Sequence, residues 1–163
     1  MNYLEFLNNL DNRLKTYYEL HCEHINCKTG CSSCCEEGDY PLSQIELEYL
    51  MQGYAKLDDD TKRIIQNNIK NIKKGGMCPF LVNKKCSVYT YRPIICRVHG
   101  LAYLCNNDVV KVPYCAKNGK NYSKVYKDGE ITINPIKENL DTQELINNYD
   151  FGEVRNLYDW IKV

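Results

Sequence analysis

The sequence predicts a mainly α-helical fold with small irregular β elements, folded as a single domain over residues 1–163. Apolar residues recur at helical spacing near both ends and in two segments between residues 43 and 75, whereas residues 101–134 hold only scattered apolar residues. No internal repeat, low-complexity tract or clear linker divides the chain. With 163 residues, of which 44% are hydrophobic and 26% charged, it is long enough to bury one globular core.

The first predicted helix covers residues 3–20. Apolar and aromatic residues recur there at three- and four-residue steps, the spacing of the buried face of an amphipathic helix: Leu4, Leu7, Leu10, Leu14, Tyr17 and Tyr18. The segment from Cys22 to Cys35 has no such periodicity, so we expect it to be a loop.

Two more helices are expected in the next part of the chain. Ser43 and Glu46 have the spacing of a capping box, which predicts that a helix begins there. The following helix should begin near Asp59 or Asp60 and end at the Gly75–Gly76 pair, because glycine commonly terminates helices.

Shorter elements complete the prediction. Two apolar pieces within residues 78–91 flank a polar turn and predict a small hairpin, and Pro93 suits the first turn of a short helix. Irregular strands are expected over residues 101–134. A C-terminal helical segment is expected over residues 139–162, with an interruption near residues 150–152.

The charge balance excludes several classes of partner. Lys plus Arg and Asp plus Glu both number 21, so the chain lacks the basic surface of a nucleic-acid-binding protein. No apolar run approaches the length of about 18 residues that a membrane span needs. Residues 1–10 show no signal peptide, so the expected compartment is the cytoplasm.

The chain contains ten cysteines, and without a secretion signal these point to metal binding rather than to disulfides. The first candidate ligands form a C-x3-C-x2-C-C motif, and the others follow some 45 residues later: Cys27, Cys31, Cys34, Cys35, Cys78, Cys86, Cys96 and Cys115. Eight thiolates are the number that two tetrahedral sites of four would need. The adjacent Cys34 and Cys35 are also suited to serving two different metals, or to bridging two that lie close together.

Zinc is the expected ion, with iron or an iron–sulfur cluster as the alternative, because soft thiolates suit both. Cys22 and Cys105 fall outside the set and are expected to be small buried residues. His99 is open to two interpretations, a metal ligand or hydrogen-bond donor beside one, or an ordinary histidine.

The motifs resemble those of the YkgJ-type cysteine-cluster family, whose members are described as carrying a zinc- or iron-chelating domain. The first is Cys27-Lys28-Thr29-Gly30-Cys31-Ser32-Ser33-Cys34-Cys35. The second is Cys78-Pro79-Phe80-Leu81, then Cys86-Ser87-Val88-Tyr89, Arg92-Pro93 and Cys96-Arg97. The resemblance covers about residues 25–118 and implies a metal-chelating core there, flanked by the N-terminal helix 3–20 and the C-terminal segment 139–162.

Two arginines flank Cys96 and are candidate cofactor-binding residues. Arg92 and Arg97 would donate hydrogen bonds to thiolate sulfur, or neutralise a negatively charged cluster. The alternative is that they pair with Glu36, Glu37 or the end of a helix.

Three functions are consistent with this cysteine pattern. The first is a metal-binding protein whose fold depends on a thiolate-ligated ion. The second is an iron–sulfur protein in electron transfer or in a protein-modification reaction, by similarity to the lysine methylases that act on flagellin. The third is metal storage or delivery. A radical-SAM enzyme is excluded because only 128 residues follow Cys35, too few for its barrel. No catalytic residue is assigned, and whether the chain is an enzyme stays open.

Overall fold

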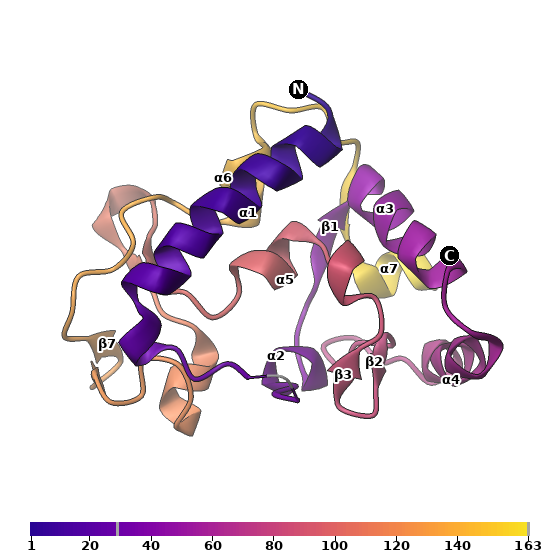
Figure 1. The fold of residues 1–163 in the computed structure, drawn as a ribbon, viewed down its shortest axis with the longest axis horizontal. Coiled ribbons are helices and arrows are strands. Elements are labelled where there is room, and N and C mark those ends of the chain that lie inside the picture. Colours follow the sequence, from indigo (N-terminus) through magenta and orange to yellow (C-terminus); the bar gives the residue numbers. More distant parts are fainter. Residues whose placement is uncertain (29, 163) are drawn as a thin grey trace. The chain divides into compact units, whose positions relative to one another are not determined.

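The computed structural model describes residues 1–28 and 30–162, and its elements are labelled in Figure 1. Helices contain 47% of the residues and strands 12%, so the predicted mainly α-helical class with small β elements is confirmed. The described chain forms two compact units. Unit 1 comprises residues 1–28 and 97–150, and unit 2 comprises residues 30–96 and 151–162. The single domain expected from the sequence stays a prediction.

Unit 1 begins with α1 (Tyr3–Leu20), which has the predicted bounds. The side chain of Asn2 caps the helix by accepting a hydrogen bond from the Glu5 N–H at 2.9 Å. The buried face of α1 consists of Tyr3, Phe6, Leu7, Leu10 and Leu14. The segment predicted to be a loop, Cys22 to Cys35, contains a 3₁₀ turn, η1 (Cys22–His24), and its last residues are helical instead, because they begin the four-residue helix α2 (Ser33–Glu36) of unit 2.

The rest of unit 1 is irregular, as the sequence predicts for residues 101–134. It contains two short antiparallel pairs, two 3₁₀ turns and one short helix: β4 (Tyr103–Leu104) with β5 (Val110–Lys111), β6 (Tyr126–Lys127) with β7 (Glu130–Ile131), η3 (Asn106–Asp108), η4 (Tyr114–Asn118) and α6 (Thr142–Ile146). Ala102, Ala116 and Tyr122 form a small buried cluster between these elements.

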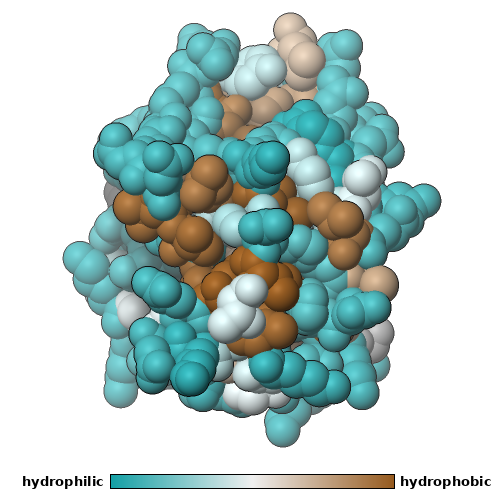
Figure 2. Space-filling model, turned by 90° about the vertical axis from the view of Figure 1, so that its left-hand side faces the viewer, coloured by the Kyte–Doolittle hydropathy of each residue, from teal (hydrophilic) through white to brown (hydrophobic). Residues whose placement is uncertain are grey.

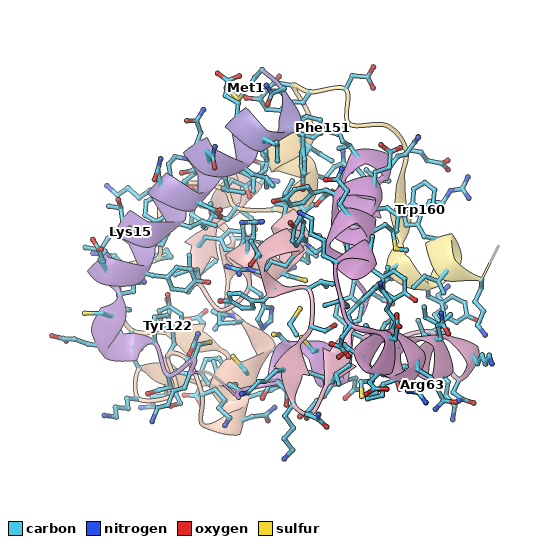
Figure 3. All side chains as sticks on the ribbon, turned by 45° about the vertical axis from the view of Figure 1, so that its right-hand side comes forward. Met1, Lys15, Arg63, Tyr122, Phe151 and Trp160 are labelled. Carbon is cyan, nitrogen blue, oxygen red and sulfur yellow. The ribbon has the colours of Figure 1, made fainter. Side chains whose placement is uncertain are left out.

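Unit 2 is built on a strand pair that joins distant parts of the chain. β1 (Pro41–Ser43) pairs antiparallel with β8 (Val154–Asn156). The remaining elements are α2 (Ser33–Glu36), α3 (Gln44–Ala55), α4 (Asp59–Lys70), β2 (Leu81–Val82), β3 (Lys85–Cys86), η2 (Tyr89–Tyr91) and α7 (Leu157–Ile161). The indole of Trp160, labelled on α7 in Figure 3, donates to the Leu42 carbonyl at 3.0 Å and so ties α7 to β1.

The apolar core of unit 2 contains residues of β1, α3, α4 and α7 and of the segments that connect the elements. They are Tyr40, Leu42, Leu50, Ile65, Phe80, Val88 and Leu157. Cys78 and Cys86 pack against this core. The chain leaves unit 2 within α5 (Ile94–Val98), the short helix that was predicted after Pro93.

One predicted helix boundary is wrong. α4 begins at the expected place but ends at Lys70 rather than at Gly75–Gly76, because the Asn71 side chain donates to the Asn67 carbonyl at 2.9 Å and closes the helix end. The C-terminal helical segment 139–162 is interrupted near residues 150–152 as predicted, but the interruption is longer than expected and extends from the end of α6 to the start of α7. Pairing with β1 makes part of it the strand β8.

The predicted hairpin is confirmed and connects β2 to β3. Its turn residues Asn83 and Lys84 have φ angles of 50° and 59°, so they form the left-handed two-residue turn that suits the twist of a hairpin. This turn fixes the register of β3, the strand that carries Cys86.

The surface drawn in Figure 2 is mainly hydrophilic, with hydrophobic residues gathered in patches across its middle. Of the helices in the described part of the chain, none is long and apolar enough to cross a membrane.

A buried carboxylate joins α3 to the start of α5. Glu46 is 0% exposed, and one of its oxygens accepts from the Ser43 N–H at 2.7 Å, which is the predicted capping-box bond. The other oxygen accepts from the Ile94 N–H at 2.8 Å. The same side chain therefore accepts from buried N–H groups at the starts of two helices, which have no acceptor within their own helix.

Replacing Glu46 with alanine should destabilise unit 2. Glu46→Ala leaves two buried N–H groups without their acceptors, so we expect a loss of about 2–4 kcal/mol in the free energy of unfolding. Glu48→Ala on the exposed side of α3 is the matched control, with an expected change below about 0.5 kcal/mol. Urea unfolding of the full chain measures both, and equal effects would contradict the role of Glu46.

Candidate metal centre

The ten cysteines are free thiols and divide between the two units. Unit 2 contains Cys31, Cys34, Cys35, Cys78, Cys86 and Cys96, and unit 1 contains Cys22, Cys27, Cys105 and Cys115. The eight expected ligands are therefore drawn from both units, six from unit 2 and two from unit 1.

Backbone hydrogen bonds bring the two halves of the cysteine motif together in unit 2. Cys34 and Cys35 lie in the single turn of α2, which is closed by the Cys35 N–H donating to the Ser32 carbonyl at 2.8 Å. The Cys78 N–H donates to the Cys35 carbonyl at 2.8 Å, which places Cys78 directly beside this turn. Figures 1 and 3 show α2 next to the β2–β3 hairpin that follows Cys78.

The last two thiols come from β3 and α5. Cys86 pairs with Leu81 across the hairpin. The residue after it, Ser87, donates from its N–H and its hydroxyl to the Phe80 carbonyl at 2.9 and 2.8 Å, which closes the loop between Cys78 and Cys86. Cys96 lies in the first turn of α5, where its N–H donates to the Pro93 carbonyl at 3.1 Å.

Four of these thiols are mutual neighbours. Each of the six pairs among Cys34, Cys78, Cys86 and Cys96 is close enough for the two groups to interact electrostatically. Cys35 interacts with Cys34, Cys78 and Cys96. We call these five side chains the thiol cluster.

One distance within the thiol cluster has the size that a metal site needs. The Sγ atoms of Cys34 and Cys35 are 3.8 Å apart. Four thiolates at about 2.3 Å from a tetrahedral ion have sulfur–sulfur separations of about 3.8 Å. Two sulfurs of the cluster therefore already have the separation of neighbouring ligands.

Burial shifts the pKa values of the cluster upward. It raises the pKa of the Cys78 thiol to about 12 and also raises the pKa values of Cys86 and Cys96, because a thiolate is poorly solvated among apolar neighbours. The exception is Cys34, whose pKa is lowered by its hydrogen bond with Cys35, while that of Cys35 is raised. Most of the cluster is thus protonated at neutral pH unless a cation binds.

Of the two candidate arginines, Arg92 acts on the thiol cluster of unit 2. Its positive charge helps to lower the pKa of Cys34, and it offsets part of the rise that burial causes in the pKa values of Cys86 and Cys96. Its guanidinium lies 3.9 Å from the centre of the Tyr89 ring and donates to the Tyr89 carbonyl at 3.2 Å, which holds it in place.

Arg97 has a different environment in unit 1. It is 5% exposed and forms an ion pair with Asp11 of α1 at 2.5 Å. Glu36, one of the two glutamates that the alternative interpretation pairs with these arginines, accepts a hydrogen bond from the Ser32 hydroxyl.

The thiol cluster fits a soft metal ion in its chemistry, although its atoms do not form a coordination shell. Among residues 1–28 and 30–162, no three Cys, His, Asp or Glu side chains are arranged to hold a metal ion. The cluster nevertheless brings five sulfur donors close enough to interact electrostatically, and such a donor set suits zinc and iron. A bound cation would also stabilise the thiolates that burial disfavours.

Cys27 and Cys115 have separate surroundings in unit 1. The fully buried Asn121 donates through Nδ2 to the Cys27 sulfur at 3.1 Å and to the Gly100 carbonyl at 2.9 Å. A side chain at Gly100 would collide with this amide, because its Cβ would lie 2.8 Å from Nδ2. Cys115 is buried on η4. Sequence reasoning missed Asn121, since no local pattern links it to Cys27.

The histidines of unit 1 take part in aromatic packing. His21 Nδ1 lies 2.8 Å from the hydroxyl of Tyr122, which is labelled in Figure 3, and burial lowers the pKa of His21. The ring of His99 lies 5.5 Å from that of Tyr114, and burial lowers the pKa of His99 as well. The prediction that Cys22 is a buried residue is wrong, because Cys22 is exposed; Cys105 is intermediate.

The comparisons with known proteins agree with the composition of the thiol cluster. Residues 26–130 match the profile of a family described as "CxxCxxCC: Putative zinc- or iron-chelating domain". No curated protein and no solved structure matches the chain. The family match spans more than half of the sequence and includes every thiol of the cluster, which confirms the resemblance seen in the two cysteine motifs. The chain belongs to the CxxCxxCC family of zinc- or iron-chelating domains.

Proposed function

We propose that unit 2 binds one zinc ion through Cys34, Cys78, Cys86 and Cys96, and that this ion organises the fold. The observation that carries the proposal is the mutual proximity of these four thiols, in which all six pairs interact. Four thiolates complete the tetrahedral coordination of zinc and leave no position for a substrate, which is typical of a structural site.

The elements that carry the ligands support an organising role. Cys34 lies on a four-residue helix, Cys86 on a two-residue strand and Cys96 on a five-residue helix. Elements of this length are not stable by themselves. An ion that binds all of them would supply part of the folding free energy of unit 2.

The charge of the proposed centre gives Arg92 a specific role. A zinc ion with four thiolates has a net charge of about −2. The Arg92 guanidinium, which already interacts with Cys34, Cys86 and Cys96, would offset part of this charge and stabilise the thiolates. The other four members of the expected eight-thiolate set are not needed for this ion: Cys27, Cys31, Cys35 and Cys115.

Metal analysis tests the identity of the centre. Protein purified without oxygen should contain one zinc ion per chain, and cobalt substitution should give the absorption spectrum of a tetrahedral thiolate site. Cys78→Ser should lose the metal, because it removes one of the four ligands, whereas the control Cys105→Ser should retain it. Iron with acid-labile sulfide would instead assign an iron–sulfur cluster, and no metal at all would contradict the proposal.

Removing the metal should unfold part of the protein. A chelator with a reductant should decrease the helical circular dichroism signal and lower the melting temperature, because the short ligand-bearing elements lose their cross-link. Addition of zinc should restore both signals. Unchanged helicity and an equally sharp melting transition after complete metal removal would exclude a role for the ion in folding.

The pKa shifts predict how zinc affinity depends on pH. Cys78, Cys86 and Cys96 have raised pKa values and are protonated at pH 7, whereas Cys34, with a pKa of about 7, is partly ionised. Zinc must displace these protons, so lowering the pH should weaken binding. The logarithm of the apparent association constant should increase by about 3–4 for each pH unit near neutrality.

Competition with a chelator of known affinity at several pH values measures this slope. Cys78→Ser removes one displaced proton, so any residual zinc binding by this variant should show a slope smaller by about one. A slope near zero for the unaltered chain would mean that the thiols are already ionised before zinc binds.

A further inference from the structure

The thiol cluster contains one sulfur more than a tetrahedral ion uses. We propose that Cys35 is an exchange ligand, a fifth thiol that replaces Cys34 on the metal while the ion passes to an acceptor. Unit 2 would then release a soft divalent cation to a thiol-rich or chelating acceptor faster than a site with four thiols alone. This inference rests on the proposed zinc centre.

The position of Cys35 allows it to take the place of Cys34. Its sulfur is 3.8 Å from that of Cys34, the separation of two ligands on one tetrahedral ion. It also interacts electrostatically with Cys78 and Cys96, two of the proposed ligands. Cys34 and Cys35 therefore share neighbours as well as lying next to each other.

The backbone of α2 makes the exchange a side-chain movement. The side chains of consecutive residues on a helix point in directions about 100° apart, yet the sulfurs of Cys34 and Cys35 are neighbours. The Cys35 carbonyl is held by the Cys78 N–H at 2.8 Å, which keeps the turn in place. A cysteine moves its sulfur by rotation about one bond between staggered positions, so ligand replacement does not require α2 to unfold.

The exchange step balances without any oxidant or reductant. A bond forms between the metal and the Cys35 sulfur as the bond to the Cys34 sulfur breaks. Cys35 gives up its thiol proton and Cys34 takes one up, while the oxidation state of the metal does not change. Both residues are partly exposed, which leaves their side of the cluster open to an acceptor.

A different role for Cys35 predicts a different number of ions. In the eight-thiolate arrangement expected from the sequence, Cys34 and Cys35 would serve two different ions or bridge them, and the chain would hold two. If Cys35 is an exchange ligand, the chain binds one metal ion. Stoichiometry therefore separates the two roles before any kinetic measurement.

The experiment follows zinc release from the full-length, zinc-loaded chain to an excess of a colorimetric chelator. Cys35→Ser should keep one zinc ion and the cobalt spectrum of a tetrathiolate site, but release zinc about tenfold more slowly. The control Cys105→Ser should release zinc at the unaltered rate. Cys34→Ser should still bind one zinc ion, because Cys35 supplies the missing thiolate, and its cobalt spectrum should show four sulfur ligands.

Three results would overturn the inference: loss of zinc from Cys35→Ser, an unchanged release rate in that variant, or two zinc ions in the unaltered chain. Loss of zinc from Cys34→Ser would also count against it, because a fixed set of four ligands behaves in that way. Absence of zinc from the unaltered chain would instead defeat the proposed zinc centre, so the two failures are distinguishable.

Discussion

The hydrogen bond from the Cys78 N–H to the Cys35 carbonyl joins two segments that lie more than 40 residues apart in the sequence. Without this contact the turn of α2 would have few partners, since it is only four residues long. The bond places the first cysteine of the second motif beside the last two of the first motif. The two cysteine motifs are therefore brought together by a backbone hydrogen bond, which does not involve the thiol side chains themselves.

The second constraint is electrostatic. Five thiols packed together are tolerated only while most of them keep their protons, because burial disfavours each thiolate and neighbouring thiolates repel one another. Arg92 supplies one positive charge at this point, held by its contact with Tyr89. One guanidinium offsets a single negative charge, so full ionisation of the cluster requires a cation. The same arrangement thus resists thiolate formation in the metal-free state and favours it when a metal binds.

Local signals predicted much of the fold, and long-range contacts account for most of what was missed. The bounds of α1, the capping box at Ser43 and the left-handed turn at Asn83 each depend on residues a few positions apart. The bond from Ile94 to Glu46 and the contact of Asn121 with Cys27 span 48 and 94 residues, and no periodicity encodes them. For the same reason the sequence predicted eight candidate thiols but did not indicate how the two units divide them.

The adjacent pair Cys34–Cys35 has a chemical consequence that a more widely spaced pair would lack. In a C-x2-C loop both sulfurs can bind the same ion, so no thiol is left without a metal bond. In unit 2 three other thiols interact with one or both members of the pair, so in the proposed centre one sulfur of the five would remain when a tetrahedral ion is complete. Such a site would hold its metal tightly at equilibrium and still exchange it quickly, because affinity depends on the four bound sulfurs and the exchange rate on the availability of the fifth. If unit 2 binds zinc as proposed, the adjacent pair makes a stable centre compatible with metal transfer.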